Sequence, residues 1–407
     1  MGAHVNTICP RKFKENLGDK PTMPERLHFD ANAGAPPLAE AREALISALS
    51  DAANASSAHA EGRLARQRIE RARVSVAEAV NARPEHVIFT SGATEAAMHG
   101  LSPLIRVGST AKSLSRLDVG ATEHPCVLAG GRFPADAVAT LPVDENGVII
   151  LGDHADAPGS IPDEAPLVAL MLANNESGVI HPVADAAERV HRSGGYLFCD
   201  AVQALGRIPV DMHALGADFL VLSSHKIGGP QGAGALVLRD GNVRPAPLLR
   251  GGGQERRHRA GTENVAAIAG FGVAASLARH HLEEAPDLAS LRDRMEAAMT
   301  EITPAVRFFG RGAQRLPNTS LFSLPGFRSE IGVIAFDLEG VAVSAGSACS
   351  SGKTEASHVL AAMGASREEM EGGIRVSLPF GASEADIDRF IETWRTVSAR
   401  ASAKRAA

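Results

Sequence analysis

A lysine placed directly after a predicted strand is the residue of this sequence best suited to chemistry. The apolar run Phe219-Leu220-Val221-Leu222 is followed by Ser223-Ser224-His225-Lys226 and then by Gly228-Gly229-Pro230. A partly desolvated lysine among hydroxyl, imidazole and backbone donors can lose its proton and form a Schiff base with an aldehyde. Pyridoxal phosphate is the aldehyde that this setting indicates, and an exposed turn lysine is the simpler alternative.

Polar clusters follow three further apolar runs. Asp200 and Gln203 follow Tyr196-Leu197-Phe198-Cys199, where a carboxylate can pair with a protonated pyridine nitrogen. The segment 90–95 joins the run 87–89 to a helix-forming stretch, and backbone N–H groups at a helix start suit a phosphate. Asn174-Asn175-Glu176 follow the run 167–172. Because ligand sites of open parallel α/β sheets collect residues from strand ends, the four clusters together predict a pyridoxal-phosphate site.

Two more residues toward the C-terminus are candidates for chemistry. Cys349 lies in the run Val343 to Gly352, which is otherwise almost entirely Ser, Ala and Gly, so its thiol is either reactive or merely exposed. Arg375 lies inside the predicted strand Gly373 to Ser377. A guanidinium fork there can bind a substrate carboxylate, and an arginine of a surface ion pair is the alternative.

The elements that must position these residues predict two domains. The pattern is helical from Pro36 to about Val80, with a turn at 54–57, and strands alternate with helices between Pro84 and Val237, which predicts a mainly parallel sheet. The segment 250–259 is too glycine-rich and charged for a regular element, so it should be a functional loop or an ordered connection, and a long helix is expected at about 265–300. We therefore expect a poorly ordered extension (1–26), a large α/β domain (27–269, its first segment also contributing to the small domain), a smaller α+β domain carrying the cysteine loop (270–395) and a frayed tail (396–407).

Composition excludes several classes of protein. The chain of 407 residues is 44% hydrophobic and 22% charged, and no run approaches the roughly 20 apolar residues of a membrane span. A net charge of −6 without a basic stripe argues against nucleic acid as a partner. The four cysteines have neither C-x-x-C nor zinc-ligand spacing, which predicts no metal site and a reducing, cytoplasmic setting. Cys126 and Cys199 are expected to be small packed thiols.

Ordered motifs along the chain carry a resemblance to a known family. They resemble those of the cysteine desulfurases, most of all the NifS/IscS branch of the class V aminotransferase-fold enzymes, from about Leu27 to Trp394. The motifs are Asn54-Ala55-Ser56-Ser57-Ala58-His59, Thr90-Ser91-Gly92-Ala93-Thr94-Glu95, Glu123-His124-Pro125, Asn174-Asn175-Glu176, Asp200-Ala201-Val202-Gln203, Ser223-Ser224-His225-Lys226, Gly251-Gly252-Gly253-Gln254-Glu255-Arg256, Gly261-Thr262 and Ser347-Ala348-Cys349-Ser350-Ser351-Gly352.

The resemblance implies a pyridoxal-phosphate-dependent transferase of fold type I that converts L-cysteine to L-alanine. It also implies a homodimer and a sulfur-acceptor protein. Position by position, it implies Lys226 as the Schiff-base lysine, Asp200 as the partner of the pyridine nitrogen, and His124 as the imidazole that stacks on the ring and transfers protons. It places Asn175 and Gln203 at the phenolic oxygen, Thr262 on the phosphate of the neighbouring subunit, and the phosphate cradle at Ala93, Thr94, Ser223 and His225. Cys349 is then the nucleophile that becomes a persulfide, Arg375 the clamp on the substrate carboxylate, and Asn175 a further substrate-binding residue.

Several positions depart from the family pattern, namely Gly34-Ala35, Ala97-Met98, His181 and Pro379-Phe380, and residues 106–160 match it only loosely. These departures favour a divergent desulfurase over a close copy of the housekeeping enzyme. A related aminotransferase or selenocysteine lyase is the nearest alternative, and a non-catalytic interaction protein that retains the fold is a more distant one. The sequence does not name the sulfur acceptor or the pathway that the acceptor serves. Iron–sulfur cluster biogenesis is one such pathway.

Overall fold

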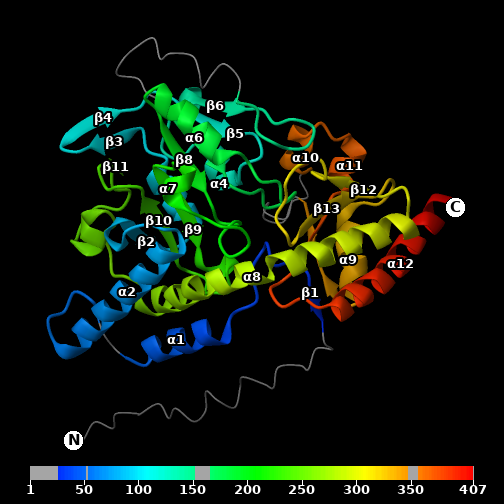
Figure 1. Ribbon diagram of the computed structural model, residues 1–407, viewed down its shortest axis with the longest axis horizontal. Coiled ribbons are helices and arrows are strands. Elements are labelled where there is room, and N and C mark those ends of the chain that lie inside the picture. The colour runs from blue at the N-terminus through cyan, green and yellow to red at the C-terminus, as the bar shows by residue number, and fades with distance from the viewer. Residues whose placement is uncertain (1–25, 52–53, 152–165, 347–355, 407) are drawn as a thin grey trace, which may run out of the picture.

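The computed structural model describes residues 26–51, 54–151, 166–346 and 356–406, and it places a large and a smaller domain side by side (Figure 1). Cys349 and the first 25 residues lie outside the described residues. The long helix α8 (Val265–Ile302) runs beneath both domains, so it crosses the predicted boundary at residue 270 without interruption.

The large domain is built on a seven-stranded sheet. Every neighbouring pair is parallel except the two that β10 makes with β2 and β9, so the predicted mainly parallel sheet is confirmed. Antiparallel pairing of β9 and β10 requires only a short connection, which the turn after Lys226 supplies. The order across the sheet is β2 (Val87–Thr90), β10 (Gly234–Leu238), β9 (Phe219–Ser223), β8 (Tyr196–Asp200), β7 (Leu167–Met171), β5 (Leu117–Gly120) and β6 (Val138–Leu141).

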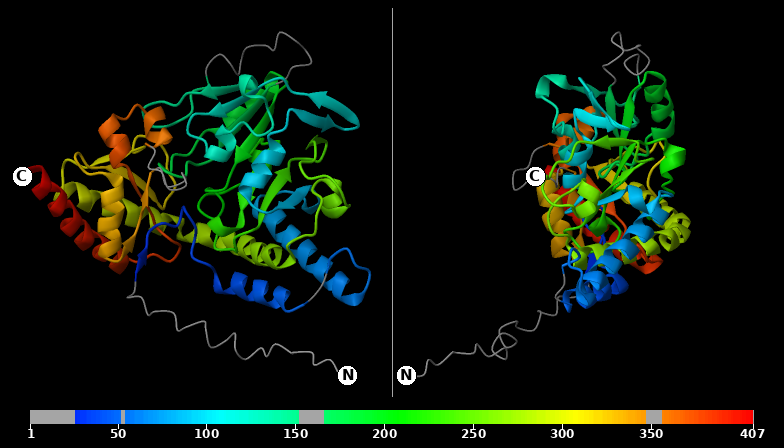
Figure 2. Two further views of the ribbon diagram at one scale, coloured as in Figure 1. Left: turned by 180° about the vertical axis from the view of Figure 1, so that it is seen from behind. Right: turned by 90° about the vertical axis from the view of Figure 1, so that its left-hand side faces the viewer.

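Successive strand residues point to opposite sides of this sheet, and helices bury both of its faces. Cys199 packs on one face with α2 (Ala60–Ala79), α6 (Val183–Arg192) and the first half of α8. Phe198, one residue earlier, packs on the other face with α3 (Ala93–Gly100) and α4 (Pro125–Leu128). α1 (Ala39–Leu49) lies against α8 beside α2, as both views of Figure 2 show.

By length and composition, α8 is the one helix among the described residues that could cross a membrane. Half of its most apolar window is buried inside the protein. Ala267, Phe271 and Ala274 belong to the core of the large domain, and Leu288 and Met295 belong to that of the small domain. The apolar residues of α8 are therefore those of a core helix that joins the two domains.

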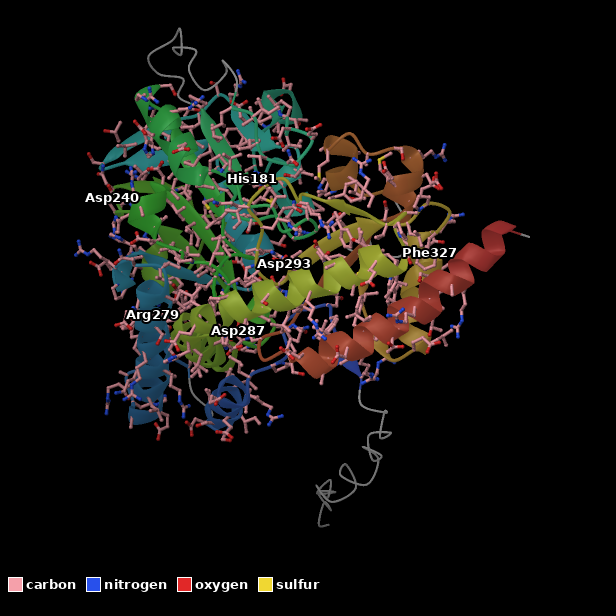
Figure 3. The ribbon with its side chains drawn as sticks, turned by 45° about the vertical axis from the view of Figure 1, so that its right-hand side comes forward. His181, Asp240, Arg279, Asp287, Asp293 and Phe327 are labelled. Carbon is pink, nitrogen blue, oxygen red and sulfur yellow. The ribbon has the colours of Figure 1, made fainter. Side chains whose placement is uncertain are left out.

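The small domain has an antiparallel sheet in the order β12 (Arg307–Phe309), β13 (Thr319–Ser323), β16 (Ile374–Ser377) and β15 (Ser344–Ala345). Trp394, Phe336 and Phe390 stack in its core, and Phe327, labelled in Figure 3, belongs to the same buried cluster. These residues come from α9 (Ser329–Leu338), α12 (Glu384–Ala406) and the loop before α9. β1 (Leu27–His28) pairs with β14 (Val341–Ala342), so the described chain begins in the small domain.

The glycine-rich segment agrees with the sequence expectation, whereas the end of the chain differs from it. Residues 250–259 form an ordered connection without a long helix or strand, and they contain a short 3-10 turn (Gln254–Arg257) in which Glu255 has a left-handed φ of 44°. The fully buried ion pair of Glu255 with Arg73, at 2.7 Å, holds this strained turn. α12 continues to Ala406, through the last residues that we expected to fray. The remaining elements are β3 (Leu104–Val107), β4 (Thr110–Ser113), β11 (Val243–Pro245), α7 (Met212–Leu215), α10 (His358–Ala362), α11 (Arg367–Gly372) and the 3-10 turns Pro84–His86, Ala135–Ala137 and Ser224–Lys226.

Candidate active site

One cavity of about 520 Å³ lies at the carboxyl ends of the strands of the large sheet and reaches the small domain. It collects ten of the predicted site residues from separate segments: Ala93, Thr94, His124, Asn175, Asp200, Gln203, Ser223, His225, Lys226 and Arg375. Thr262 is not part of its lining, and Cys349 lies outside the described residues. The cavity thus brings together predicted site residues that are up to 282 residues apart in sequence (375 − 93).

Lys226 ends the short 3-10 turn that follows β9. Its Nζ donates to the backbone oxygens of Asn32 at 2.6 Å and Ala33 at 3.0 Å. The turn continues through Gly228, whose φ of +80° favours glycine and whose position would bring a Cβ within 2.7 Å of Leu38. Two backbone carbonyls and a glycine-dependent turn therefore hold the amine in the cavity.

Asp200 is the last residue of β8 and is 7% exposed. Burial raises the pKa of its carboxyl from 3.8 to about 6, against the opposing effects of a hydrogen bond from the Val202 N–H and the charge of Lys226. A cationic group beside this carboxylate would return the pKa toward its usual value. Asp200 is thus a buried acid that a positively charged ligand atom would stabilise in its ionised form.

Two buried amide side chains face the same cavity with unused hydrogen-bonding capacity. Asn175 Oδ1 and Gln203 Oε1 have no partner among the residues that the structure describes. Gln203 is fixed at its other end because Nε2 donates to the Asn32 backbone oxygen at 3.0 Å. Buried polar atoms of this kind normally have partners, so their arrangement points to a polar ligand.

The start of α3 supplies the predicted phosphate cradle. Gly92 precedes the helix, and the segment Ser91 to Glu95 lines the cavity. Gly234 of β10 lies so close that a Cβ there would fall 2.6 Å from the Gly92 carbonyl carbon, so only glycine permits the contact. The free N–H groups and positive dipole end of α3 favour an anion. Ser223, which pairs with Gly234 between β9 and β10, also lines the cavity, and its Oγ lies 3.0 Å from His225 Nδ1.

His124 lies at the amino end of α4 and lines the cavity. Burial, with the positive charges of Lys226 and His358, lowers the pKa of its imidazole to about 4. The ring is therefore neutral near neutral pH and can both accept and donate a proton. Burial also raises the pKa of the preceding Glu123, whose Oε1 accepts a hydrogen bond from the Met171 N–H at 2.6 Å.

Arg375 enters the cavity from β16 of the small domain. It is 2% exposed, and its Nη2 donates to Asp30 Oδ1 at 2.6 Å while its Nη1 donates to the Asn175 backbone oxygen at 3.0 Å. The sequence offered a substrate clamp and an ion-paired arginine as alternatives. The structure shows the ion pair, and Arg375 also lines the cavity.

Thr262 lies in a separate hollow of about 110 Å³ that shares Ser91 and Gly232 with the main cavity. It is exposed, and it precedes the first turn of α8. Arg259, in the same hollow, forms an ion pair with Glu95 at 2.8 Å. Within its own chain, Thr262 is therefore outside the site that holds the other predicted residues.

Two residues that the sequence analysis did not single out hold the site together. Asn32 donates from Nδ2 to the Asn175 backbone oxygen at 3.2 Å and accepts from Lys226 and Gln203 through its own carbonyl. Arg207 is 1% exposed and donates to the backbone oxygens of Gln203 at 2.9 Å and Lys226 at 3.3 Å. Asn32 lies just before Gly34, which departs from the family pattern, so the sequence drew attention to this segment. Nothing in the sequence around Arg207 marked it as part of the site.

The departures from the family pattern lie around the site. His181, labelled in Figure 3, is 4% exposed; its Nδ1 accepts from the Ile149 N–H at 3.2 Å, and burial lowers its pKa to about 4. Phe380 stacks on His281 with a centroid distance of 3.8 Å and covers the guanidinium of Arg207 at 5.9 Å. Neither residue lines the main cavity. They act on the site only through the elements that they support.

The residues present fit pyridoxal phosphate. The start of α3 with Ser223 and His225 would hold the phosphate, Asp200 would face the protonated ring nitrogen, and the unpartnered amides of Asn175 and Gln203 would face the remaining polar edge. Lys226 would supply the amine that binds the aldehyde. The sheet with its strand-end cavity therefore defines a pyridoxal-phosphate enzyme of fold type I.

Comparisons with known proteins agree. The family Aminotransferase class-V matches residues 27–390. A cysteine desulfurase of Cereibacter sphaeroides is 38% identical over 90% of this chain and 94% of its own length, and cysteine desulfurase IscS of Methanosarcina thermophila is 36% identical over 91% of each. The crystal structure of a NifS-like protein from Rickettsia africae covers 92% of this chain and 99% of its own, with a TM-score of 0.80 and 30% identity.

A structure of SspA in complex with cysteine also matches, with a TM-score of 0.73 and 28% identity, and covers 88% of this chain and 99% of its own. The chain therefore belongs to the class-V aminotransferase family, in which these curated relatives are cysteine desulfurases. Its cofactor is pyridoxal phosphate, as in the relatives. The predicted family, fold class and cofactor are thus confirmed.

Proposed function

We propose that this chain is a cysteine desulfurase that converts L-cysteine to L-alanine and leaves the sulfur as a persulfide on Cys349 for delivery to an acceptor protein. Curated cysteine desulfurases at 36–38% identity over about 90% of the chain support the activity. The observation that carries the proposal is that Lys226, Asp200 and Arg375 line one cavity, because the reaction needs an amine, an acid at the ring nitrogen and a cation for the substrate carboxylate.

The side chains divide the work of the reaction. Pyridoxal phosphate, when bound, supplies an electron sink for the electron pair that remains when the substrate α-proton is removed. Lys226 takes the α-proton of cysteine, and Arg375 holds the substrate carboxylate. Asp200 keeps the ring nitrogen protonated, and His124 transfers protons at the ring.

Sulfur transfer needs a nucleophile in addition to these groups. The thiolate of Cys349 attacks the substrate sulfur, so a sulfur–sulfur bond forms as the carbon–sulfur bond breaks. The electron pair of the broken bond stays with the carbon, which gains a proton and becomes the methyl group of alanine. No external oxidant is needed, because the carbon is reduced by the electron pair that it keeps while the transferred sulfur becomes the outer sulfur of the persulfide.

We further propose that the enzyme acts as a homodimer in the cytoplasm. The position of Thr262 supports the dimer, since this exposed residue lies outside the main cavity of its own chain and could serve the phosphate site of a second copy. A reducing compartment suits a reaction that depends on free thiols. The resemblance to the NifS/IscS branch supports a role in iron–sulfur cluster biogenesis, with the acceptor protein as partner.

The test uses the purified holoenzyme and L-cysteine labelled in its sulfur. We expect one alanine per sulfur released, with label on Cys349 when reductant is omitted, and Lys226→Ala should abolish both. Amino-group transfer to a keto acid would identify an aminotransferase instead, and strict dependence on selenocysteine would identify a lyase. A colourless protein that binds no pyridoxal phosphate would show that the chain is a non-catalytic relative.

A further inference from the structure

Cys126 has a contact that the sequence analysis did not expect. Cys199 is fully buried in β8 and Cys126 is partly buried against the core of the large domain, as expected of small packed thiols, but Cys126 also lines the main cavity. It is the second residue of α4, and its Sγ lies 3.0 Å from Nδ1 of His124. The thiol therefore contacts the one imidazole that we assign to the face of the cofactor ring.

The geometry of α4 fixes which nitrogen of His124 carries the proton. His124 caps the helix, and its Nδ1 accepts a hydrogen bond from the backbone N–H of Cys126 at 3.3 Å. An amide N–H can only donate, so Nδ1 must present a lone pair. Since the low pKa of the buried ring keeps it neutral near pH 7, the single ring proton is then on Nε2.

The thiol of Cys126 can only act as a donor toward this lone pair. Burial, together with the negative charges of Asp200 and Glu123, raises its pKa to about 12 against the opposing effect of a side-chain hydrogen bond with Thr94, so the S–H form persists near neutral pH. A thiol in this form is a weak donor and a poor nucleophile. This separates Cys126 from Cys349, whose proposed role requires a thiolate.

We propose that Cys126 is a positioning residue for His124: its S–H donates to Nδ1 and, with the backbone N–H of the same residue, holds the imidazole in the Nε2–H tautomer with Nε2 left for the cavity. The inference deepens the proposed function and rests on it only for the claim that His124 moves a proton during turnover. The placement of the thiol and the tautomer are properties of this chain alone.

Three variants separate this role from simple packing. Cys126→Ser keeps a donor on the same atom position, Cys126→Ala removes it, and Cys199→Ala removes a buried thiol that has no contact with His124 among the hydrogen bonds of the described residues. The ring is observed directly by ¹⁵N NMR of protein labelled in histidine, with His124→Gln identifying its signals. This readout works with or without bound cofactor and does not depend on turnover.

In the wild type we expect an unprotonated, hydrogen-bonded Nδ1 and a protonated Nε2. Cys126→Ala should move the Nδ1 signal toward that of a free imidazole nitrogen and raise the pKa of His124 by about 0.5 to 1, because the lost donor stabilised the neutral ring. In the holoenzyme it should lower kcat roughly 3- to 10-fold with little change in KM. Cys126→Ser should restore both properties, and Cys199→Ala should leave the His124 signals unchanged.

An Nδ1 signal that does not change in Cys126→Ala would overturn the positioning role, and so would a serine variant that behaves like the alanine variant. The proposed function fails separately. If the wild type makes no alanine from cysteine while the NMR results are as expected, the desulfurase assignment is wrong and the thiol still sets the tautomer. If alanine is made and the NMR signals do not respond, only the role of Cys126 is refuted.

Discussion

Replacing Arg375 by alanine tests the substrate site most directly, because this guanidinium has two tasks that can be measured separately. It forms an ion pair with Asp30 at 2.6 Å, and it lines the cavity in which cysteine is expected to bind. A purely structural arginine would affect folding alone. A substrate clamp would also affect the use of cysteine.

The structure sets the size of each effect. Breaking a fully buried ion pair costs about 3–5 kcal/mol, but the Asp30 side chain is 20% exposed and keeps some hydration, so we expect Arg375→Ala to lower the free energy of unfolding by about 1–3 kcal/mol. A charge-assisted contact with the substrate carboxylate is worth about 3 kcal/mol, or about 10²-fold in kcat/KM. Most of this loss should be in KM, since the contact is present in ground and transition states alike.

Urea unfolding and initial-rate kinetics with cysteine are the two assays. Arg315→Ala is the matched control: it breaks the buried pair of Arg315 with Glu296 at 2.8 Å, away from the cavity lining, and should lower stability without raising KM. Asp30→Asn keeps an oxygen acceptor but removes its charge, so it should lower KM severalfold by leaving the cation to the substrate. If Arg375→Ala lowers stability and leaves KM at the wild-type value, Arg375 is structural and the clamp is refuted.

Three further perturbations have defined outcomes. Cys349→Ala should keep the yellow cofactor and still bind cysteine, yet lose sulfur labelling and nearly all alanine formation; label on Cys126 or Cys199 would contradict the mechanism. Between pH 7 and pH 5, the wild type should lose about 2 kcal/mol of its free energy of unfolding through His99. His99→Leu should abolish this part of the loss, as measured by urea unfolding. The pKa of His99 is lowered from 6.5 to about 4 by burial, so its contribution is present above pH 6.5 and lost as pH falls toward 4. Glu255→Gln should lower the free energy of unfolding by about 3–5 kcal/mol, because Arg73 stays buried and loses its carboxylate partner at 2.7 Å. Glu70→Gln, which removes the half-exposed partner of the same arginine, should lower it by less than about 1 kcal/mol in the same assay.

The parts of the site that sequence predicts are those fixed by local pattern. Lys226, Asp200 and Asn175 each follow an apolar strand, and parallel pairing of β7 with β8 and of β8 with β9 brings their carboxyl ends to one edge. The start of α3 follows from a short strand and a small-residue turn. No such pattern predicts that Asn32 bridges Lys226 and Asn175, because these contacts join residues far apart in sequence.

The glycine-rich segment at 250–259 shows the same limit. Its composition correctly argues against a long helix or strand, but it does not reveal that Glu255 turns inward to a fully buried ion pair with Arg73, 182 residues away. The tail shows the opposite error. Its Ala/Arg-rich composition reads as frayed, yet alanine and arginine are strong helix formers, and buried Trp394 and Val397 hold the helix on the small domain.

The charges of the cavity also determine which way round the cofactor binds. Burial raises the pKa of Asp200 to about 6 although the charge of Lys226 opposes this shift, so a protonated ring nitrogen beside the carboxyl would supply a further counter-charge. By linkage, ionising Asp200 and binding the cationic end of the cofactor stabilise each other. The start of α3 instead favours the anionic phosphate. Because the reversed orientation would place the phosphate beside a buried acid, these two features favour the orientation with the phosphate at the start of α3 and the ring nitrogen at Asp200.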